Sequence, residues 1–423
     1  MTDVGAPVQT QVDQRYTHGL CLAVAVGIAT FCGALLVRAE ENTSLDLSQA
    51  LTLVRAQTPL TTEAESGVAA AEGRVQQAGV RPNPEASVQV EGFAGSGPFR
   101  GTNQAETTVA LSQRIELGGK RRARLDAAHA EVDVAGLRLV IQRADLEFMA
   151  RDRFSEACAA KERVALAESA VERARALSGV ADVLVASGRD PPLRASRARA
   201  ALNERAADLI VALADYASSR LALAAVWGAA TPPTEVVGPW EFPLGPNESA
   251  PDPTRSLDLA LAEAESHAAE AIVRRERSLA TTDVTAQTGV RRTDTGDVAI
   301  VAGVSIPIPL FDQNRGSVAA ALADASATYA RRQQALIEVT RRTRDAQATL
   351  VAAQVRLETL RDRTVPQAAE ALRLARLGYQ AGRFPLLDVL DAEAMFAEVK
   401  TSLVEARLAH AKASAVLTRA AVH

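Results

Sequence analysis

Aromatic residues, lysine and recognisable catalytic motifs are all scarce in this chain of 423 residues. Aromatic residues make up 4% of it, and alanine supplies much of the apolar content. That mix favours long helices packed through small side chains over a thick aromatic core. The net charge of −4 is small and gives no indication of nucleic-acid binding or of a polyanionic substrate. Arginine is abundant, whereas lysine occurs only at Lys120, Lys161, Lys400 and Lys412.

Motifs for catalysis and metal binding are missing. The sequence has no phosphate-binding glycine loop, no nucleophile elbow and no paired histidine motif. Transition-metal sites need clustered His, Cys or carboxylate ligands, and no such cluster is visible. We therefore predict no enzymatic activity, no cofactor and no resident metal site. The histidines of the mature chain are scattered, at His129, His267, His410 and His423.

One long apolar run stands near the N-terminus. Arg15 and His18 precede this run, 19–37, and the small residue Ala39 follows it, before two glutamates. A charged start, an apolar stretch and a small-residue end are typical of an export signal, so we predict a signal peptide at 1–39. An uncleaved membrane anchor is the alternative, because the run approaches spanning length. No other segment is long and apolar enough to span a bilayer as a helix.

Cysteine is also rare. Cys21 and Cys32 fall inside the predicted signal peptide, and neither has the sequence context of a lipoprotein cleavage site. Cys158 would then be the only cysteine left after cleavage, which excludes an intrachain disulfide. We expect it to act as a small residue in helix packing.

The rest of the chain contains an internal repeat. Residues 111–117 resemble 304–310, and 188–193 resemble 382–387, at nearly the same offset. A proline-rich stretch that cannot be regular helix separates the two copies. Self-similarity at one offset indicates a duplicated structural unit. The predicted organisation is a signal peptide at 1–39, a first repeat at 40–228, a linker at 229–255 and a second repeat at 256–423.

Each repeat has the same predicted order of elements. A helix at 46–79 or 256–281 precedes two short segments in which apolar and polar residues alternate. Period two with turn-rich connections predicts a β-hairpin in each repeat, at 85–115 and 284–308. A very long helix follows, from 121 to about 186 in the first repeat. At 1.5 Å per residue this helix reaches about 100 Å, which suits a protein that crosses a compartment.

The long helices carry an apolar stripe and end at similar corners. Mixed seven- and eleven-residue spacing predicts a nearly straight coil. Glycine tolerates the positive φ that ends one helix, and proline fits the first turn of the next. Pro366 should kink the second long helix above its corner. The stripe residues are Leu125, Val132, Leu139, Leu146, Ala157, Val164 and Val171, then Leu322, Tyr329, Leu336, Leu350 and Leu357. The corners are Gly188, Arg189 and Pro191 (188–191), and Gly382, Arg383 and Pro385 (382–385).

Four amphipathic strands per chain cannot close a barrel, and an open sheet edge cannot face lipid. If the strands enter a membrane, several chains must share one barrel. A soluble pair of hairpins that caps a coiled coil is the alternative, because the barrel pattern is weak in each segment.

This order of elements, together with the strings at 304–310 and 382–392, resembles the TolC-like outer-membrane efflux family. The resemblance covers essentially the whole mature chain. It implies a mainly helical protein with a small β part, assembled as a homotrimer in which a 12-stranded outer-membrane barrel, four strands from each chain, stands on a periplasmic helical barrel. It also implies a passive exit duct for a tripartite pump, with a periplasmic adaptor and an inner-membrane RND pump as partners. The linker would lie in a belt around the middle of the helices.

Residues 113–121 resemble the branch of that family that serves heavy-metal pumps of the cobalt–zinc–cadmium type. The resemblance implies divalent metal cations as cargo, with drug efflux or type I secretion as alternatives. Gly118 and Gly119 let a strand turn into a helix. We expect a basic collar at the lipid headgroups from Lys120 and Arg121, with Arg122 and Arg124. A periplasmic adaptor is the rival class, but it should carry one helical hairpin and extensive β domains. The apolar N-terminus and the strands disfavour a cytosolic coiled-coil scaffold.

Asp388 and Asp391 lie three residues apart after the second corner and so share one helix face. They match the family's Leu-Asp-Val-Leu-Asp-Ala motif, whose aspartates line the pore entrance. In a trimer the resemblance implies two stacked carboxylate rings, which form a cation-favouring filter. The alternative is that both pair with Arg194 and Arg197 of the first repeat. Arg383 departs from the family's pattern, which leaves open which residue holds the tip shut.

Overall fold

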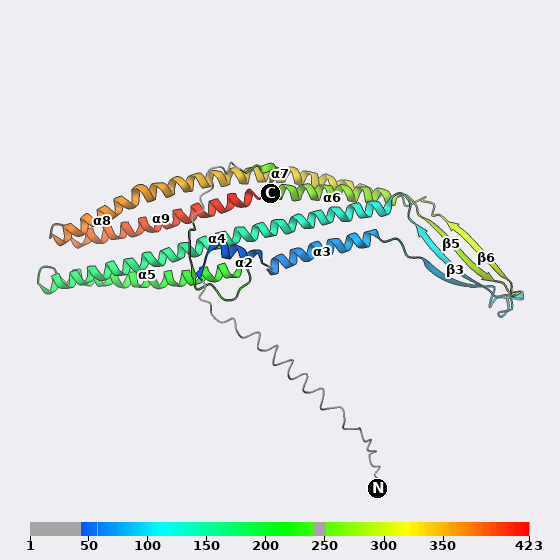
Figure 1. The fold of residues 1–423 in the computed structure, drawn as a ribbon, viewed down its shortest axis with the longest axis horizontal. Helices are drawn as coiled ribbons and strands as arrows, with labels where there is room; N and C mark the ends of the chain where they lie inside the picture. Colours follow the sequence, from blue (N-terminus) through cyan, green and yellow to red (C-terminus); the bar gives the residue numbers. More distant parts are fainter. Residues whose placement is uncertain (1–43, 57, 241–250, 423) are drawn as a thin grey trace, which may run out of the picture.

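The chain folds into a long rod of helices with a sheet at one end (Figure 1). The computed structural model describes residues 44–56, 58–240 and 251–422. The predicted signal peptide and part of the linker lie outside these residues. The helices are α2 (Leu47–Arg55), α3 (Pro59–Gly79), α4 (Lys120–Ala186), α5 (Pro192–Ala225), α6 (Leu257–Leu279), α7 (Arg315–Thr359), α8 (Val365–Gln380) and α9 (Leu386–Ala420). The strands are β1 (Ser44–Leu45), β2 (Glu85–Glu91), β3 (Glu106–Ile115), β4 (Glu235–Val236), β5 (Val284–Arg292) and β6 (Val298–Ser305).

Both halves show the predicted elements, but the first predicted helix was wrong in one respect. The expected continuous helix at 46–79 is two helices, because α2 ends at Arg55 and α3 begins at Pro59. The Thr58 hydroxyl accepts a hydrogen bond from the Thr61 backbone N–H at 3.2 Å and caps α3. Proline at the first helical position loses no hydrogen bond, so Pro59 starts a new helix rather than continuing the old one.

The strands β2, β3, β5 and β6 form one antiparallel sheet in that order. The register places Val88 opposite Val109, and Val109 opposite Val290. The outer strands, β2 and β6, each have one free edge within the described chain. The second hairpin is shorter than the predicted 284–308, since β6 ends at Ser305. Proline cannot donate to a strand ladder, and Pro307 and Pro309 follow.

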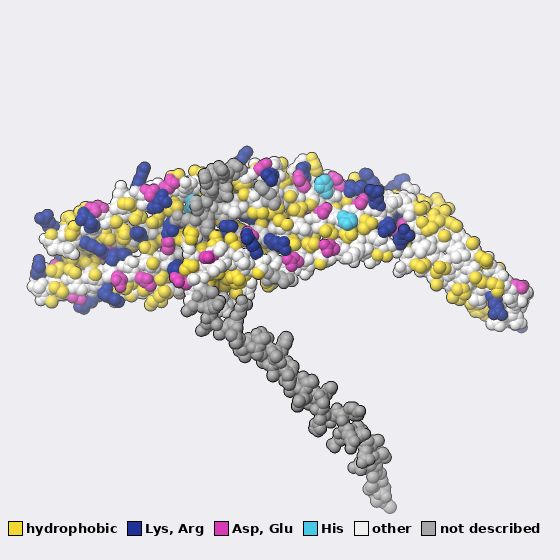
Figure 2. Space-filling view, in the orientation of Figure 1, with side chains coloured by type: hydrophobic (Ala, Val, Ile, Leu, Met, Phe, Trp, Pro, Cys, Tyr) yellow, Lys and Arg dark blue, Asp and Glu magenta, His cyan; other side chains and the backbone are white. Residues whose placement is uncertain are grey.

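Alternation gives the sheet one apolar and one polar face. Val88, Val109, Val290 and Ile300 occupy paired positions on the apolar face, and all are exposed, Ile300 to 84%. Hydrophobic side chains cover much of the sheet in Figure 2. A contiguous exposed apolar face of this kind marks contact with lipid or with another chain.

The helices form one curved layer near the sheet and two hairpins further away. Near the sheet, α4 packs against α3 and α6, and α6 packs against α7. At the other end the α4–α5 hairpin lies beside the α8–α9 hairpin (Figure 1). The helix α4 has 67 residues, or about 100 Å, and runs through both parts.

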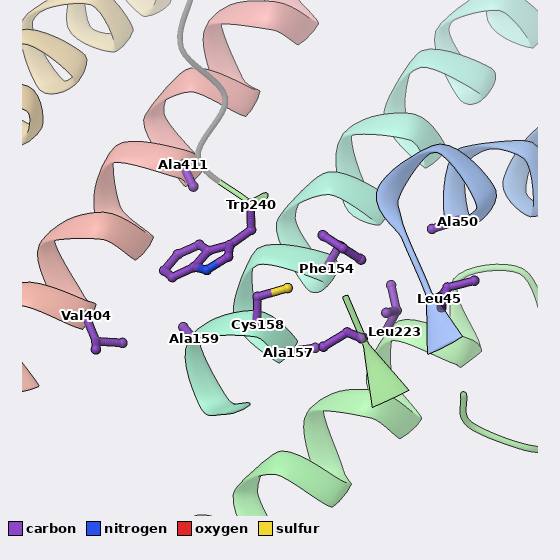
Figure 3. Close-up of a cluster of buried hydrophobic side chains, with 11 residues drawn as sticks. Leu45, Ala50, Phe154, Ala157, Cys158, Ala159, Leu223, Trp240, Val404 and Ala411 are labelled. Atoms are coloured by element: carbon purple, nitrogen blue, oxygen red, sulfur yellow. The ribbon is translucent and has the colours of Figure 1, made fainter. Parts of the chain in front are cut away.

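A belt of core packing surrounds the middle of α4 (Figure 3). Phe154 is fully buried there, and Trp240 from the linker packs beneath Arg407 of α9, 4.6 Å from the guanidinium carbon to the ring centre. The parallel pair β1–β4, too short to be predicted, also belongs to this belt. Cys158 is buried in the same cluster, as expected, and burial raises the pKa of its thiol to about 12.

The second long helix differs from the first in two ways. A π-helical turn, Leu360–Thr364, separates α7 from α8, and Pro366, where a kink was predicted, is the second residue of α8. Pro366 lacks the N–H that would bond four residues back, so the ladder changes register there. The predicted apolar stripe is buried at Leu350 and Leu357, but Leu322 and its neighbours in the stripe nearer the sheet are exposed. Among the described residues, this stripe of α7 is therefore left uncovered near the sheet, although α6 packs against another face of the helix.

Candidate functional site at the hairpin tips

The first corner follows α4 and turns through Gly188. This residue has φ +72°, and the N–H of Arg189 bonds back to Leu184 at 2.9 Å. Such bonds satisfy carbonyl groups at the end of a helix, and a left-handed glycine makes them possible. Pro191 then precedes Pro192, the first residue of α5. The Arg189 side chain is exposed at this corner.

The second corner repeats this geometry between α8 and α9. Gly382 has φ +71°, and the N–H of Arg383 bonds to Gly378 at 2.8 Å. The ring of Phe384 lies against Gly378, where an added Cβ would meet its Cδ2 at 2.1 Å. Any side chain at position 378 would therefore displace the ring. Pro385 occupies the N-cap position of α9, and Arg383 is exposed.

Contacts between the two corners were not predicted. The Tyr379 hydroxyl donates to Oδ2 of Asp190 at 3.2 Å, and Arg194 also pairs with Asp190. Burial, and then the charge of Asp190, raises the pKa of Tyr379. Val389 packs beneath Tyr379, with Leu177 from α4 beside them. The interior glycine Gly378 was the one local indication that a ring packs here.

Asp388 and Asp391 both lie in the first turns of α9, with exposed side chains. Within the described chain, neither forms an ion pair with Arg194 or Arg197. Arg194 pairs instead with Asp190, four residues earlier. The two carboxylates are therefore exposed at the start of α9, and among the described residues neither is paired with the arginines of the first repeat.

The predicted basic collar lies at the junction of sheet and helices. The prediction was wrong for Lys120, which is not on the surface. Lys120 is only 7% exposed, and its Nζ lies 2.6 Å from Oδ1 of Asp283. Gly118 and Gly119 adopt φ of +67° and +72°, which folds the chain so that the lysine points inward. An added Cβ at Gly118 would meet the Thr281 hydroxyl at 2.5 Å.

The arginines of the collar also bind their own chain. Arg121 donates to the carbonyl of Gly79 at 2.7 Å, at the end of α3. Arg124 pairs with Glu116 and donates to the carbonyl of Val80 at 3.1 Å. These contacts fasten α3, β3 and α4 together, so the collar positions the sheet on the helices.

The described residues lack both a metal-ligand cluster and a membrane-spanning helix. No three His, Cys, Asp or Glu side chains come together there as a group that could hold a metal. No helix in those residues combines the length and the apolar character needed to cross a membrane.

Solved structures with this fold include outer-membrane proteins. The outer membrane protein VceC of Vibrio cholerae has a TM-score of 0.76 to this chain at 22% identity, covering 89% of this chain and 95% of that one. A helical rod with a small sheet at its end is thus the fold of a known class of outer-membrane proteins.

The family model described as outer membrane efflux protein matches residues 50–229 and again 254–421. The chain therefore belongs to the outer membrane efflux protein family, and it is an efflux protein of the outer membrane that extends into the periplasm.

Two curated relatives are heavy-metal resistance proteins. The cobalt-zinc-cadmium resistance protein CzcC of Cupriavidus metallidurans is 32% identical over 329 residues, which cover 76% of this chain and 77% of that protein. The nickel-cobalt-cadmium resistance protein NccC of Alcaligenes xylosoxydans xylosoxydans is 27% identical over 350 residues, 82% and 78% of the two chains.

Proposed function

We propose that this protein is the homotrimeric exit duct of a tripartite pump and conducts divalent heavy-metal cations through the periplasm and the outer membrane. It would receive them from an inner-membrane RND pump through a periplasmic adaptor, and it would catalyse no reaction. One observation carries the proposal: within the described residues, a four-stranded sheet with two free edges continues into α4, a helix about 100 Å long.

The free edges support the trimer. Backbone groups at the edges of β2 and β6 would be unsatisfied in lipid, and only a closed barrel removes such edges. Three chains with four strands each would give a barrel of twelve. The exposed apolar residues on α7, such as Leu322, would then pack against a neighbouring chain. One trimer would therefore satisfy the free strand edges and bury the exposed apolar residues of α7.

The metal cargo is supported by the relatives and by the hairpin tips. Both curated relatives are named for resistance to cobalt and cadmium. In a threefold assembly Asp388 and Asp391 would form two carboxylate rings where the hairpins converge. Rings of aspartate favour cations over anions.

Deleting the gene tests this function. We expect greater sensitivity to zinc, cobalt, cadmium or nickel, with drug sensitivity unchanged, and restoration by the wild-type gene. Sensitivity to drugs alone would favour the drug-efflux alternative.

Native mass measurement of the detergent-extracted protein should show a trimer, and a uniform folded monomer would contradict the shared barrel.

Tyr379→Phe should make the closed tip open more readily. The substitution removes the hydrogen bond to Asp190, and a bond to a charged group contributes about 1.5–3 kcal/mol. Single-channel recording should show a higher open probability. Because the folded-state pKa of Tyr379 is raised, its proton and this bond persist until the pH rises through that value. Tyr329→Phe, on α7 and outside the hairpin tips, is the matched control, and equal open probabilities in both variants would contradict the role of the bond.

A cysteine at Ser96 should react with an impermeant thiol reagent on intact cells. The long helices must run into the periplasm, so the loop at 95–103 and the turn at 293–296 should face outside. The native Cys158 gives little background, because it is buried and its thiol pKa is about 12. The chain without the added cysteine is the control. Labelling only after the outer membrane is broken would contradict the predicted orientation of this loop.

A further inference from the structure

A charged network joins three strands at the end of the sheet furthest from the helices. The guanidinium of Arg291 on β5 lies 3.2 Å from a carboxylate oxygen of Glu106 on β3 and 3.6 Å from one of Glu91 on β2. Its Nε donates to the Thr108 hydroxyl at 3.1 Å. Gln89 donates to Glu91 at 2.8 Å. The network is thus hydrogen-bonded from several directions.

The strand register puts this network on the polar face. Glu91 lies directly opposite Glu106, and Thr108 lies opposite Arg291. The neighbouring pair Val109 and Val290 points to the other, apolar face. If the apolar face contacts lipid, the network faces the lumen. Charged side chains are visible near this end of the sheet in Figure 2.

Two glutamates directly opposite each other in a sheet repel. Arg291 relieves this repulsion by lying against both, and the three side chains together carry a net charge of −1. Their side chains stay partly open to solvent, with exposures of 37% for Arg291, 47% for Glu91 and 33% for Glu106. Their charge therefore acts on ions in the lumen as well as on each other.

We propose that Arg291 sets the charge selectivity of the outer mouth of the barrel, by holding Glu91 and Glu106 in a triad of net charge −1. This inference rests on the proposed trimeric barrel, in which three triads would form one ring. The sheet lies at the opposite end of the molecule from the corner between α8 and α9 (Figure 1), and Asp388 and Asp391 follow that corner. The duct would then have a cation-favouring filter at each end, and Arg291 would limit the strength of the outer one.

The test is the reversal potential of purified trimers in planar bilayers under a KCl gradient. Arg291→Gln should raise the potassium-to-chloride permeability ratio roughly twofold to fivefold near 0.1 M salt. The change should shrink near 1 M salt, where the Debye length is about 3 Å. Glu91→Gln with Glu106→Gln should lower the ratio by a similar factor, and Arg291→Lys should keep it near the wild-type value.

Arg292→Gln is the matched control. This substitution removes the same charge from the next residue of β5, whose side chain lies on the opposite face of the sheet. Equal ratios for Arg291→Gln and Arg292→Gln would overturn the inference. If Arg291→Gln does not assemble, an unchanged ratio in the double glutamate variant would overturn it instead. A wild-type protein that forms no conducting pore would refute the proposed function itself, whereas a conducting wild type with an insensitive triad refutes only the outer filter.

Discussion

Replacing both Asp388 and Asp391 with asparagine should weaken block of the channel by multivalent cations roughly tenfold to a hundredfold. Both side chains are exposed on the first turns of α9, and within the described chain neither pairs with Arg194 or Arg197. In the proposed trimer the double substitution would therefore remove six exposed carboxylates from the proposed pore entrance. Cation selectivity should fall with the block, because the same charges attract both kinds of ion.

Conductance of purified trimers, with a multivalent cation added on the side of the helices, measures this effect. Asp294→Asn with Asp297→Asn removes the same charge from the turn between β5 and β6 at the far end and should leave the block unchanged. Each single aspartate variant should give an intermediate result. Unchanged selectivity and block in the Asp388 and Asp391 double variant would show that these carboxylates do not line the pore.

Phe154→Ala should lower the free energy of unfolding by about 3–5 kcal/mol, the usual cost of removing a buried phenylalanine. Phe154 is 0% exposed in the belt cluster, where α4 meets the linker and α9 (Figure 3). The cavity would lie at the point where the two halves of the chain are joined, so it cannot be closed by moving one surface helix.

Thermal or denaturant unfolding, followed by the helical circular dichroism signal, would show the loss. Phe93→Ala is the control, since Phe93 is 53% exposed beyond β2 and its removal should change stability by less than about 0.5 kcal/mol. A wild-type transition in Phe154→Ala would mean that the belt is not a packed core.

Local patterns in the sequence predicted most of the elements. Period two predicted β2, β3, β5 and β6, because alternate residues of a strand face opposite sides. The Gly-Arg-x-Pro strings predicted both corners, and Gly188 and Gly382 do adopt the left-handed conformation that ends a helix. Pro366 predicted the interruption that the structure shows as a π-helical turn.

The errors arose where a residue's surroundings come from distant parts of the chain. Lys120 was expected at a basic surface, yet it is buried against Asp283, 163 residues away. Tyr379 was not predicted to take part in the tip, since its partner Asp190 lies 189 residues earlier. The missed break before Pro59 is an error of another kind. The proline and the threonine that caps α3 are neighbours in the sequence, so the break could have been predicted from them.

The sequence by itself determined the long helices, the amphipathic strands and the corners, because periodicity, glycine and proline act within a few residues of their own position. Only the tertiary structure decided which charges meet. Strand register brings Arg291 between Glu91 and Glu106. The pairing of two hairpins brings Tyr379 to Asp190, while among the described residues Asp388 and Asp391 stay exposed and unpaired with Arg194 or Arg197. Those pairings depend on how far-separated segments align across a sheet or between helices, and no local pattern encodes that alignment.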